Sequence, residues 1–358
     1  MILDLHIDNC RVFTGDSTTL SLHTETKADN SMYALHKAGN LLISKYTCIY
    51  GASGSGKSVL LDSIYAMASF ASAEDNVVTN VLVPHFAHKD KPTTATLTFL
   101  HKDRKHEYSL TVENDSITKE SLRIQKTRQF STVCKADGNI TESCVYKAFK
   151  QGNQDVVDAF SYFSRITFST ASTKHPHVPE CLVSSAFEAQ PLALELMSKL
   201  FKSSDLGVDS IVIKDKKFVG KVAYGSDPVC YADMTLDELG SGAQQLFKVA
   251  LRIIPVLVNG GVAVVDNFDD SLHPLLAEHV LELFKHDFTN PHNAQLICAM
   301  RAAGCMNRLL KQQIVFCNHN KGSISEIYAL NDFQGVRKDD NYSAKYLAGA
   351  YGAIPDCN

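Results

Sequence analysis

The glycine-rich segment at residues 51–58 constrains the fold of this chain more than any other feature. Its sequence, GASGSGKS, matches the pattern G-x-x-x-x-G-K-[ST] in full. An apolar, β-branched stretch precedes it at residues 41–50, and residues 58–70 carry apolar side chains at helical spacing. A strand, a glycine loop and a helix in this order predict a phosphate-binding loop. Its backbone N–H groups point at phosphate oxygens, and the helix N-terminus adds partial positive charge.

The side chains of this loop and of a second motif predict ATP and Mg²⁺ as the ligands. Lys57 is expected to reach the β- and γ-phosphates, and the Ser58 hydroxyl is expected to bind Mg²⁺. The second motif, GVAVVDNFDDSLHP at residues 261–274, is a buried strand that ends in Asp266, a second ligand for the metal. The candidate nucleotide-binding residues of the loop are Gly51, Ser53, Gly54, Ser55, Gly56, Lys57 and Ser58.

The remaining patterns predict an α/β core with a mainly parallel sheet. Residues 93–112 alternate as a β-meander, and residues 181–202, 246–258 and 273–284 read as helices. Residues 294–299 form a further apolar strand. Strands that alternate with helices at both ends of the chain are typical of this fold class.

Composition excludes several other classes. The net charge of −4 rules out a strongly basic nucleic-acid coat protein, and no apolar run approaches the ~20 residues that cross a bilayer. The N-terminus does not resemble a signal peptide, so we expect a cytoplasmic protein with no membrane partner. The ten cysteines contain no C-x-x-C pair, which disfavours a zinc ribbon. His175, His177 and Cys181 are separated by prolines and favour a loop over a metal site.

Several motifs spread over nearly the whole chain resemble one family. It comprises bacterial ABC-type ATP-binding proteins (AAA-family ATP/GTP phosphatases), relatives of SMC proteins and of the ATPase part of OLD nucleases. The resemblance implies an ABC-type P-loop ATPase head with a β-rich and helical insertion in place of a coiled coil. The motifs are NCRVF at residues 9–13, YGASGSGKS at 50–58, SDLGVDSI at 204–211, SLHP at 271–274, the segment 333–339, and YLAGAYGAIP at 346–355.

The resemblance also implies a division of the chain and a mode of assembly. Residues 1–75 are expected to form the P-loop lobe, 76–224 the insertion, and 225–358 the lobe with the signature loop and Asp266. Family members dimerise head to tail, with ATP held between the P-loop of one subunit and the signature loop of the other. That loop maps to residues 239–244, where Ser241 and Gly242 are the candidate contacts because Gly240 stands at the usual serine position.

Two departures from the family pattern affect hydrolysis. Asn267 stands where a glutamate normally activates the attacking water, and an amide is not a useful general base. Arg301 stands where a histidine normally contacts the γ-phosphate, and a guanidinium stays ionised and cannot shuttle a proton. Asp269 and Asp270 lie nearby, either as substitutes for the missing base or as residues that shape the loop.

The residues therefore leave three functions open. The first is a module that dimerises on ATP–Mg²⁺ and hydrolyses slowly, and the resemblance suggests a sensor or regulator in bacterial anti-phage defence. The second is a fully active ATPase coupled to a nuclease or toxin effector, and the third is an inactive subunit paired with an active paralogous head.

Nuclease chemistry within this chain is disfavoured, and Asn318 and His319 read as part of a turn. Nucleic-acid contact stays open because basic side chains recur in the middle of the chain. These are Lys102, Arg104, Lys105, Lys119, Arg123, Lys126 and Arg128.

Overall fold

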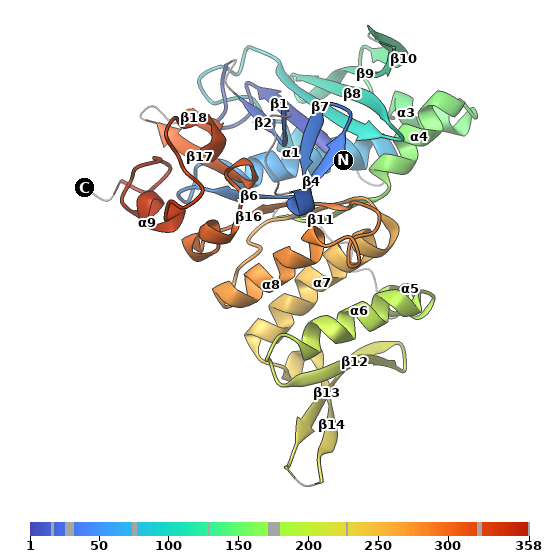
Figure 1. Cartoon of the computed structure of the whole chain (residues 1–358). Helices are drawn as coiled ribbons and strands as arrows, with labels where there is room; N and C mark the ends of the chain where they lie inside the picture. The colour runs from blue at the N-terminus through green and yellow to red at the C-terminus, as the bar shows by residue number, and fades with distance from the viewer. Residues whose placement is uncertain are drawn as a thin grey trace.

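The fold is built around a six-stranded central sheet. The computed structural model describes residues 1–15, 18–25, 32–73, 77–127, 129–170, 180–226, 228–320 and 324–356. The strand order is β11-β15-β16-β6-β17-β18, with the first five strands parallel and β18 antiparallel at the edge (Figure 1). The bounds are β11 Ile166–Ser169, β15 Val262–Val265, β16 Gln295–Ala299, β6 Tyr46–Tyr50, β17 Ile314–Asn320 and β18 Ile324–Ala329.

The central strands are mostly apolar because both faces of the sheet are buried. Successive residues of a strand point to opposite faces, so each strand contributes to two separate hydrophobic cores. In β15, Val264 belongs to the first core and Val265 to the second. In β16, Ile297 and Cys298 divide in the same way.

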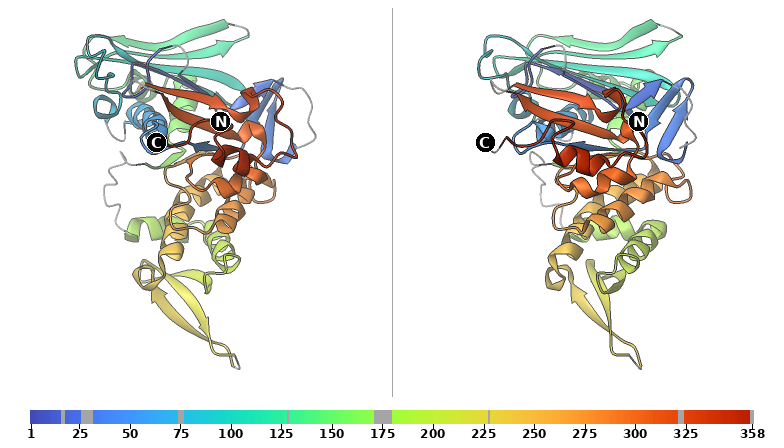
Figure 2. Two further views of the ribbon diagram at one scale, coloured as in Figure 1. Left: turned by 90° about the vertical axis from the view of Figure 1, so that its left-hand side faces the viewer. Right: turned by 60° about the vertical axis from the view of Figure 1, so that its left-hand side comes forward.

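An antiparallel sheet covers the first face, with helix α1 between the two sheets (Figures 1 and 2). Its strand order is β10-β9-β8-β7-β1-β2. The strands are β1 Ile2–Asp8, β2 Thr19–Ser21, β7 Thr93–His101, β8 Arg104–Glu113, β9 Ser116–Lys126 and β10 Gln129–Asp137. The helices of this layer are α1 Lys57–Ser72, α2 Val78–Val81, α3 Cys144–Lys150 and α4 Gln154–Phe163.

Helices cover the second face of the central sheet. They are α7 Ser241–Asn259 and α8 Pro274–Lys285. Helix α6, Pro191–Lys202, packs on α7 as a further layer, and α5 Glu180–Glu188 precedes it. Beyond α6 lies a sheet with the order β12-β13-β14, whose outer hairpin projects from the body (Figure 2). Its strands are β12 Val208–Lys214, β13 Lys217–Tyr224 and β14 Cys230–Thr235.

The smaller elements lie at one side and near the C-terminus. A three-stranded sheet has the order β3-β5-β4, with β3 His23–Glu25, β5 Leu41–Ser44 and β4 Leu35–Ala38. Helix α9, Tyr342–Leu347, follows β18, and the Tyr346 ring stacks on Phe316 of β17 with centroids 5.4 Å apart. Among the described residues, no helix is both long enough and apolar enough to cross a bilayer.

The strands of the segment 76–224 are distributed over three sheets rather than gathered in one insertion. Strands β7 to β10 extend the sheet that begins with β1, and β11 joins the central sheet beside β15. Helices α5 and α6 and strands β12 and β13 of this segment lie on the far side of the central sheet, where β14 pairs with β13 (Figure 1). Sequence patterns did not indicate this division, because strand pairing joins residues far apart in the chain.

Two local predictions were wrong. The single helix predicted over residues 181–202 is two helices, because Pro191 stands at the start of α6 and has no N–H to continue the preceding helix. Asn318 and His319 lie in strand β17 rather than in a turn, and β17 pairs with β18 over these residues. Residues 175 and 177 lie outside the described part of the chain, as does the side chain of Cys181.

Candidate functional site

Three loops meet at the carboxyl edge of the central sheet. The loop of residues 51–56 follows β6, Asp266 follows β15, and Arg301 lies two residues beyond the end of β16. Strand β16 lies between β6 and β15, so the three loops are neighbours. Ligands of open α/β sheets bind at this edge.

Two glycines of the loop stand where a side chain does not fit. Gly51 has a φ of +154°, and a Cβ there would lie 2.2 Å from the carbonyl oxygen of Cys317. Gly56 has a φ of +103°, and a Cβ there would lie 2.6 Å from the ring of Phe13. The neighbouring strand β17 and the N-terminal segment therefore fix the path of the loop.

We expect Gly51→Ala to destabilise the fold by about 2–3 kcal/mol, because its Cβ would overlap a backbone oxygen. Thermal unfolding measures the effect. Gly54→Ala is the matched control, since Gly54 also has positive φ but has open space around it. Equal midpoints for the two variants would show that the contact with β17 is unimportant.

The Lys57 side chain forms hydrogen bonds with the backbone of the P-loop. Its Nζ donates hydrogen bonds to the carbonyl oxygens of Gly51 and Ala52, at 2.7 and 2.9 Å. Burial lowers the pKa of the Lys57 ammonium below its ordinary value. A phosphate group would replace two neutral carbonyls with charged oxygens, and hydrogen bonds between charged groups are stronger.

Ser58 and Asp266 are brought together as predicted. The Ser58 hydroxyl donates to the carboxylate of Asp266 at 2.6 Å, and Asp266 is 9% exposed. A hydroxyl and a carboxylate are oxygen ligands that suit Mg²⁺, so this pair fits the metal. The buried Ser55 hydroxyl has no hydrogen-bond partner among the described residues, which leaves a polar group in the loop for a ligand to satisfy.

Asn267 and Arg301 form a direct contact. The guanidinium Nη2 of Arg301 donates to the side-chain oxygen of Asn267 at 2.8 Å. Asn267 has a φ of +49°, and its N–H donates to Asp266 at 2.9 Å. The two residues that the resemblance identified as departures from the family pattern are thus partners, and a permanent positive charge lies against the side chain of Asn267.

Asp269 does not have the surroundings of a general base. Its carboxylate is 7% exposed and accepts hydrogen bonds from the backbone N–H of Arg301, at 3.0 and 3.1 Å, and of Ala302, at 2.5 Å. The carboxylate therefore joins the loop after β15 to the loop after β16. This arrangement supports the alternative in which Asp269 shapes the loop.

The segment expected to be the signature loop, residues 239–244, borders a cavity that the P-loop does not line. Ser241 and Gly242 begin helix α7, and Gly242 lines a cavity of about 570 Å³ together with Ser271 and His273. No residue of the P-loop lines this cavity. The structure thus brings Ser58, Asp266, Asn267, Asp269 and Arg301 together near the loop, and it places Ser241 and Gly242 beside another motif.

Three residues at the site were not predicted as contacts. Gln245, the first residue after the signature loop, donates to the carbonyl oxygen of Asn267 at 3.3 Å. The Cys317 thiol donates to the carbonyl oxygen of Ser55 at 3.0 Å, and Phe13 packs against Gly56. Phe13 belongs to a motif noted in the sequence, but nothing in the sequence indicates which residue of β17 reaches the loop.

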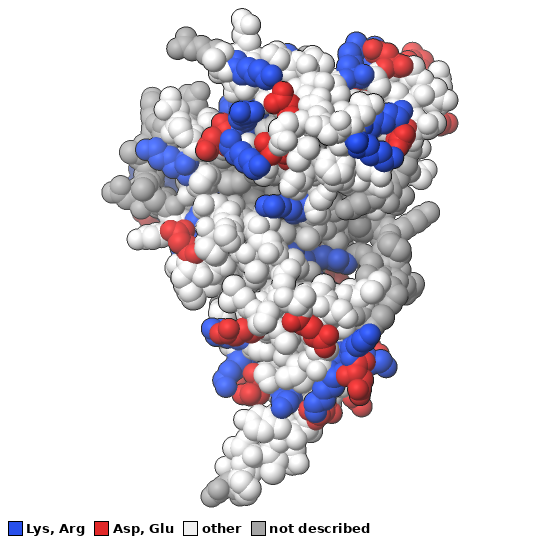
Figure 3. Space-filling view, turned by 90° about the vertical axis from the view of Figure 1, so that its right-hand side faces the viewer, with Lys and Arg blue, Asp and Glu red and all other residues white. Residues whose placement is uncertain are grey.

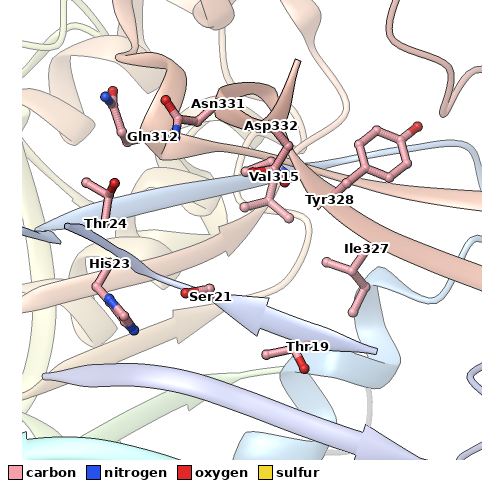
Figure 4. Close-up of a pocket in the computed structure, with 11 residues that line it drawn as sticks. Thr19, Ser21, His23, Thr24, Gln312, Val315, Ile327, Tyr328, Asn331 and Asp332 are labelled. Atoms are coloured by element: carbon pink, nitrogen blue, oxygen red, sulfur yellow. Dashed lines mark hydrogen bonds between the residues drawn. The ribbon is translucent and has the colours of Figure 1, made fainter. Parts of the chain in front are cut away.

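A cavity elsewhere on the molecule does not belong to the predicted nucleotide site. A cavity of about 220 Å³ between β2, β3, β17 and β18 contains His23 and Asp332 but none of the predicted site residues (Figure 4). Among the described residues, no cluster of His, Cys, Asp and Glu could hold a metal.

Four of the basic residues in the middle of the chain are paired with carboxylates, and Arg128 lies outside the described residues. Figure 3 shows Lys and Arg interspersed with Asp and Glu on the face that it draws. The ion pairs are Lys102–Asp158, Arg104–Asp155, Lys126–Asp155 and Arg123–Glu107.

Comparisons with known proteins identify the family and the fold. A family model described as "AAA domain, putative AbiEii toxin, Type IV TA system" matches residues 46–299. The crystal structure of the SMC head bound to the C-winged helix domain of ScpA aligns with a TM-score of 0.54 at 11% identity, over 92% of this chain and 97% of that one. An SMC head domain from Thermotoga maritima aligns with a TM-score of 0.46 at 14% identity, over 92% and 98%. A search of curated proteins found no match.

The family match covers well over half of the chain, including the P-loop, Asp266 and β16. The structural match shows the fold of an SMC head. The chain therefore belongs to the AAA-domain family of the AbiEii type and is a P-loop ATPase with an SMC-like head.

Proposed function

We propose that this protein is an ATP-gated dimerising module whose own hydrolysis is slow. The observation that carries the proposal is the contact between Asn267 and Arg301 beside a complete P-loop. The residues for binding phosphate and metal are present, whereas the position of the general base holds an amide bonded to a guanidinium. Loss of a general base costs about 10²–10⁴ in rate.

Each residue has a separate role in this proposal. Mg²⁺ bound by Ser58 and Asp266 would neutralise phosphate charge. Lys57 leaves its two carbonyl partners and pairs with phosphate oxygens. Arg301 supplies a fixed positive charge, and Asn267 donates or accepts hydrogen bonds without taking up a proton. ATP then persists, so the nucleotide-bound state is long-lived.

Dimerisation follows from the position of the signature loop. Ser241 and Gly242 do not line a cavity with the P-loop of their own chain, and the helix N-terminus that they form is suited to an anion. In a head-to-tail pair, this helix terminus would meet the nucleotide of the partner copy. ATP would then contact both copies only in the closed form, which couples occupancy to assembly.

Gel filtration with light scattering tests this proposal. We expect the wild-type chain to shift from monomer to dimer on addition of ATP–Mg²⁺, and Lys57→Ala to remain monomeric because it has lost the phosphate contact. Phosphate release should be low in both proteins. A wild-type chain that stays monomeric with ATP would contradict the proposal, and brisk phosphate release above the Lys57→Ala background would favour an active ATPase instead.

We further propose that the module acts as a sensor or regulator in anti-phage defence, together with an effector such as a nuclease or toxin. The description of its family, which names a putative toxin of a toxin–antitoxin system, supports this role. Phage challenge of cells that carry the native operon tests it, with Lys57→Ala as the inactive control. Co-purification of a paralogous head would instead support the paired, inactive subunit.

A further inference from the structure

Two cysteines outside the nucleotide site lie within reach of one another. The thiol of Cys144, the first residue of α3, donates to the sulfur of Cys134 on β10, and the two sulfur atoms are 3.2 Å apart. A disulfide has a sulfur–sulfur distance of about 2.05 Å, so a shift of little more than 1 Å would close the bond. Both cysteines are free in the structure.

The backbone around this pair holds the two sulfurs in place. The register of β10 against β9 shifts between Thr132 and Cys134, and such bulges redirect side chains. Val133 and Cys134 consequently both pack against the hydrophobic core although they are consecutive.

On the other side of the pair, the buried carboxylate of Glu120 anchors the start of α3. It accepts hydrogen bonds from the Cys144 N–H at 2.6 Å and from the Ser143 hydroxyl at 2.5 Å. The Tyr108 hydroxyl donates to the same carboxylate at 2.9 Å, which fixes Glu120 against the sheet.

The two sulfurs differ in their access to solvent. Cys134 is half-buried on the edge strand, whereas Cys144 is 9% exposed. The hydrogen bond to Cys134, burial and the charge of Glu120 raise the pKa of the Cys144 thiol well above its usual value. An oxidant from solvent therefore reaches Cys134 first, and the more buried Cys144 lies in contact with it.

We propose that Cys134 and Cys144 form a peroxide-sensitive thiol pair that closes to a disulfide between β10 and α3. The Cys134 thiolate attacks hydrogen peroxide. An S–O bond forms, the O–O bond breaks, and the departing hydroxide takes up the proton that the Cys134 thiol released on ionising and becomes water. The Cys144 sulfur then attacks the sulfenic sulfur. An S–S bond forms, the S–O bond breaks, and the Cys144 proton leaves with the hydroxide as a second water. Two thiols are oxidised and one peroxide is reduced.

Peptide mapping of the full chain tests this directly. After peroxide treatment, alkylation and tryptic digestion, we expect the peptides QFSTVCK and ADGNITESCVYK, residues 129–135 and 136–147, to appear joined. Their joined mass should be about 2 Da below the sum of the free peptides, and reduction should separate them. If the two peptides were recovered separately, each with its cysteine alkylated, the proposal would be overturned.

A second pair of neighbouring cysteines provides an internal control for the peroxide treatment. The sulfurs of Cys48 and Cys298 lie 3.7 Å apart, but both residues are fully buried in the second core. We expect this pair to stay reduced under the same treatment, because proximity without access does not permit oxidation. Oxidation of Cys48 and Cys298 to the same extent would show that unfolding, and not the geometry at Cys134, exposes the thiols.

Single variants separate the roles of the two sulfurs. Cys134→Ser should leave Cys144 reduced, since the accessible sulfur has been removed. Cys144→Ser should leave Cys134 without a resolving partner, so that it proceeds to the sulfinic acid. Equal oxidation of either cysteine when the other is absent would contradict the proposed order.

Discussion

Asn267→Glu alone is expected to leave ATP hydrolysis close to the wild-type rate, although it introduces the residue that the family resemblance leads us to expect at this position. Arg301 already donates to the side-chain oxygen of residue 267 at 2.8 Å. A glutamate there would form a charge-assisted pair with the guanidinium, which favours the ionised carboxylate and lowers its affinity for a proton. A carboxylate held in this way is a poor base.

The double variant Asn267→Glu with Arg301→His is expected to hydrolyse ATP about 10²–10⁴ times faster than the wild type. Histidine removes the permanent charge, so the glutamate becomes free to accept a proton. Phosphate release under single-turnover conditions measures the gain. Asn267→Gln with Arg301→His is the matched control, because glutamine has the length of glutamate without its basicity.

The single and double variants together decide whether the two positions are coupled. If Asn267→Glu alone turned over as fast as the double variant, the contact between Arg301 and residue 267 would not restrain the base. If the double variant stayed as slow as its glutamine control, the slow hydrolysis would have another cause.

Asp269→Ala is expected to lower the free energy of unfolding by about 2–5 kcal/mol, because it removes the charged acceptor of the partly buried N–H groups of Arg301 and Ala302. The loop after β16 would lose its link to the loop after β15, and Arg301 would no longer be held against Asn267. Chemical denaturation measures the loss of stability, and nucleotide affinity measures the displacement of Arg301.

Asp270→Ala provides the matched control for this prediction. Asp270 is adjacent and acidic but exposed, so its replacement should change stability by no more than about 0.5 kcal/mol. Asp269→Asn should fall between the two, since the amide keeps one acceptor oxygen. Equal stability of the Asp269→Ala and Asp270→Ala proteins would show that the hydrogen bonds to the backbone contribute little.

The sequence determined the class of the fold and predicted the residues of the candidate site. The strand before Gly51, the helix after it and the strand that ends in Asp266 are short-range patterns, and the structure has all three. The contact between Ser58 and Asp266 also follows from them, because strands that end at the same sheet edge bring their following residues together.

The tertiary structure alone decided which partners these residues have. The hydrogen bonds of Asp269 to the backbone after β16, the contact of Arg301 with Asn267 and the approach of Cys317 to the P-loop join residues more than 30 positions apart. Side-chain type and spacing do not encode such contacts, because they depend on the order of the strands in the sheet. For the same reason, β7 pairs with the N-terminal strand β1 and carries β8 to β10 into the same sheet, and β11 joins the central sheet.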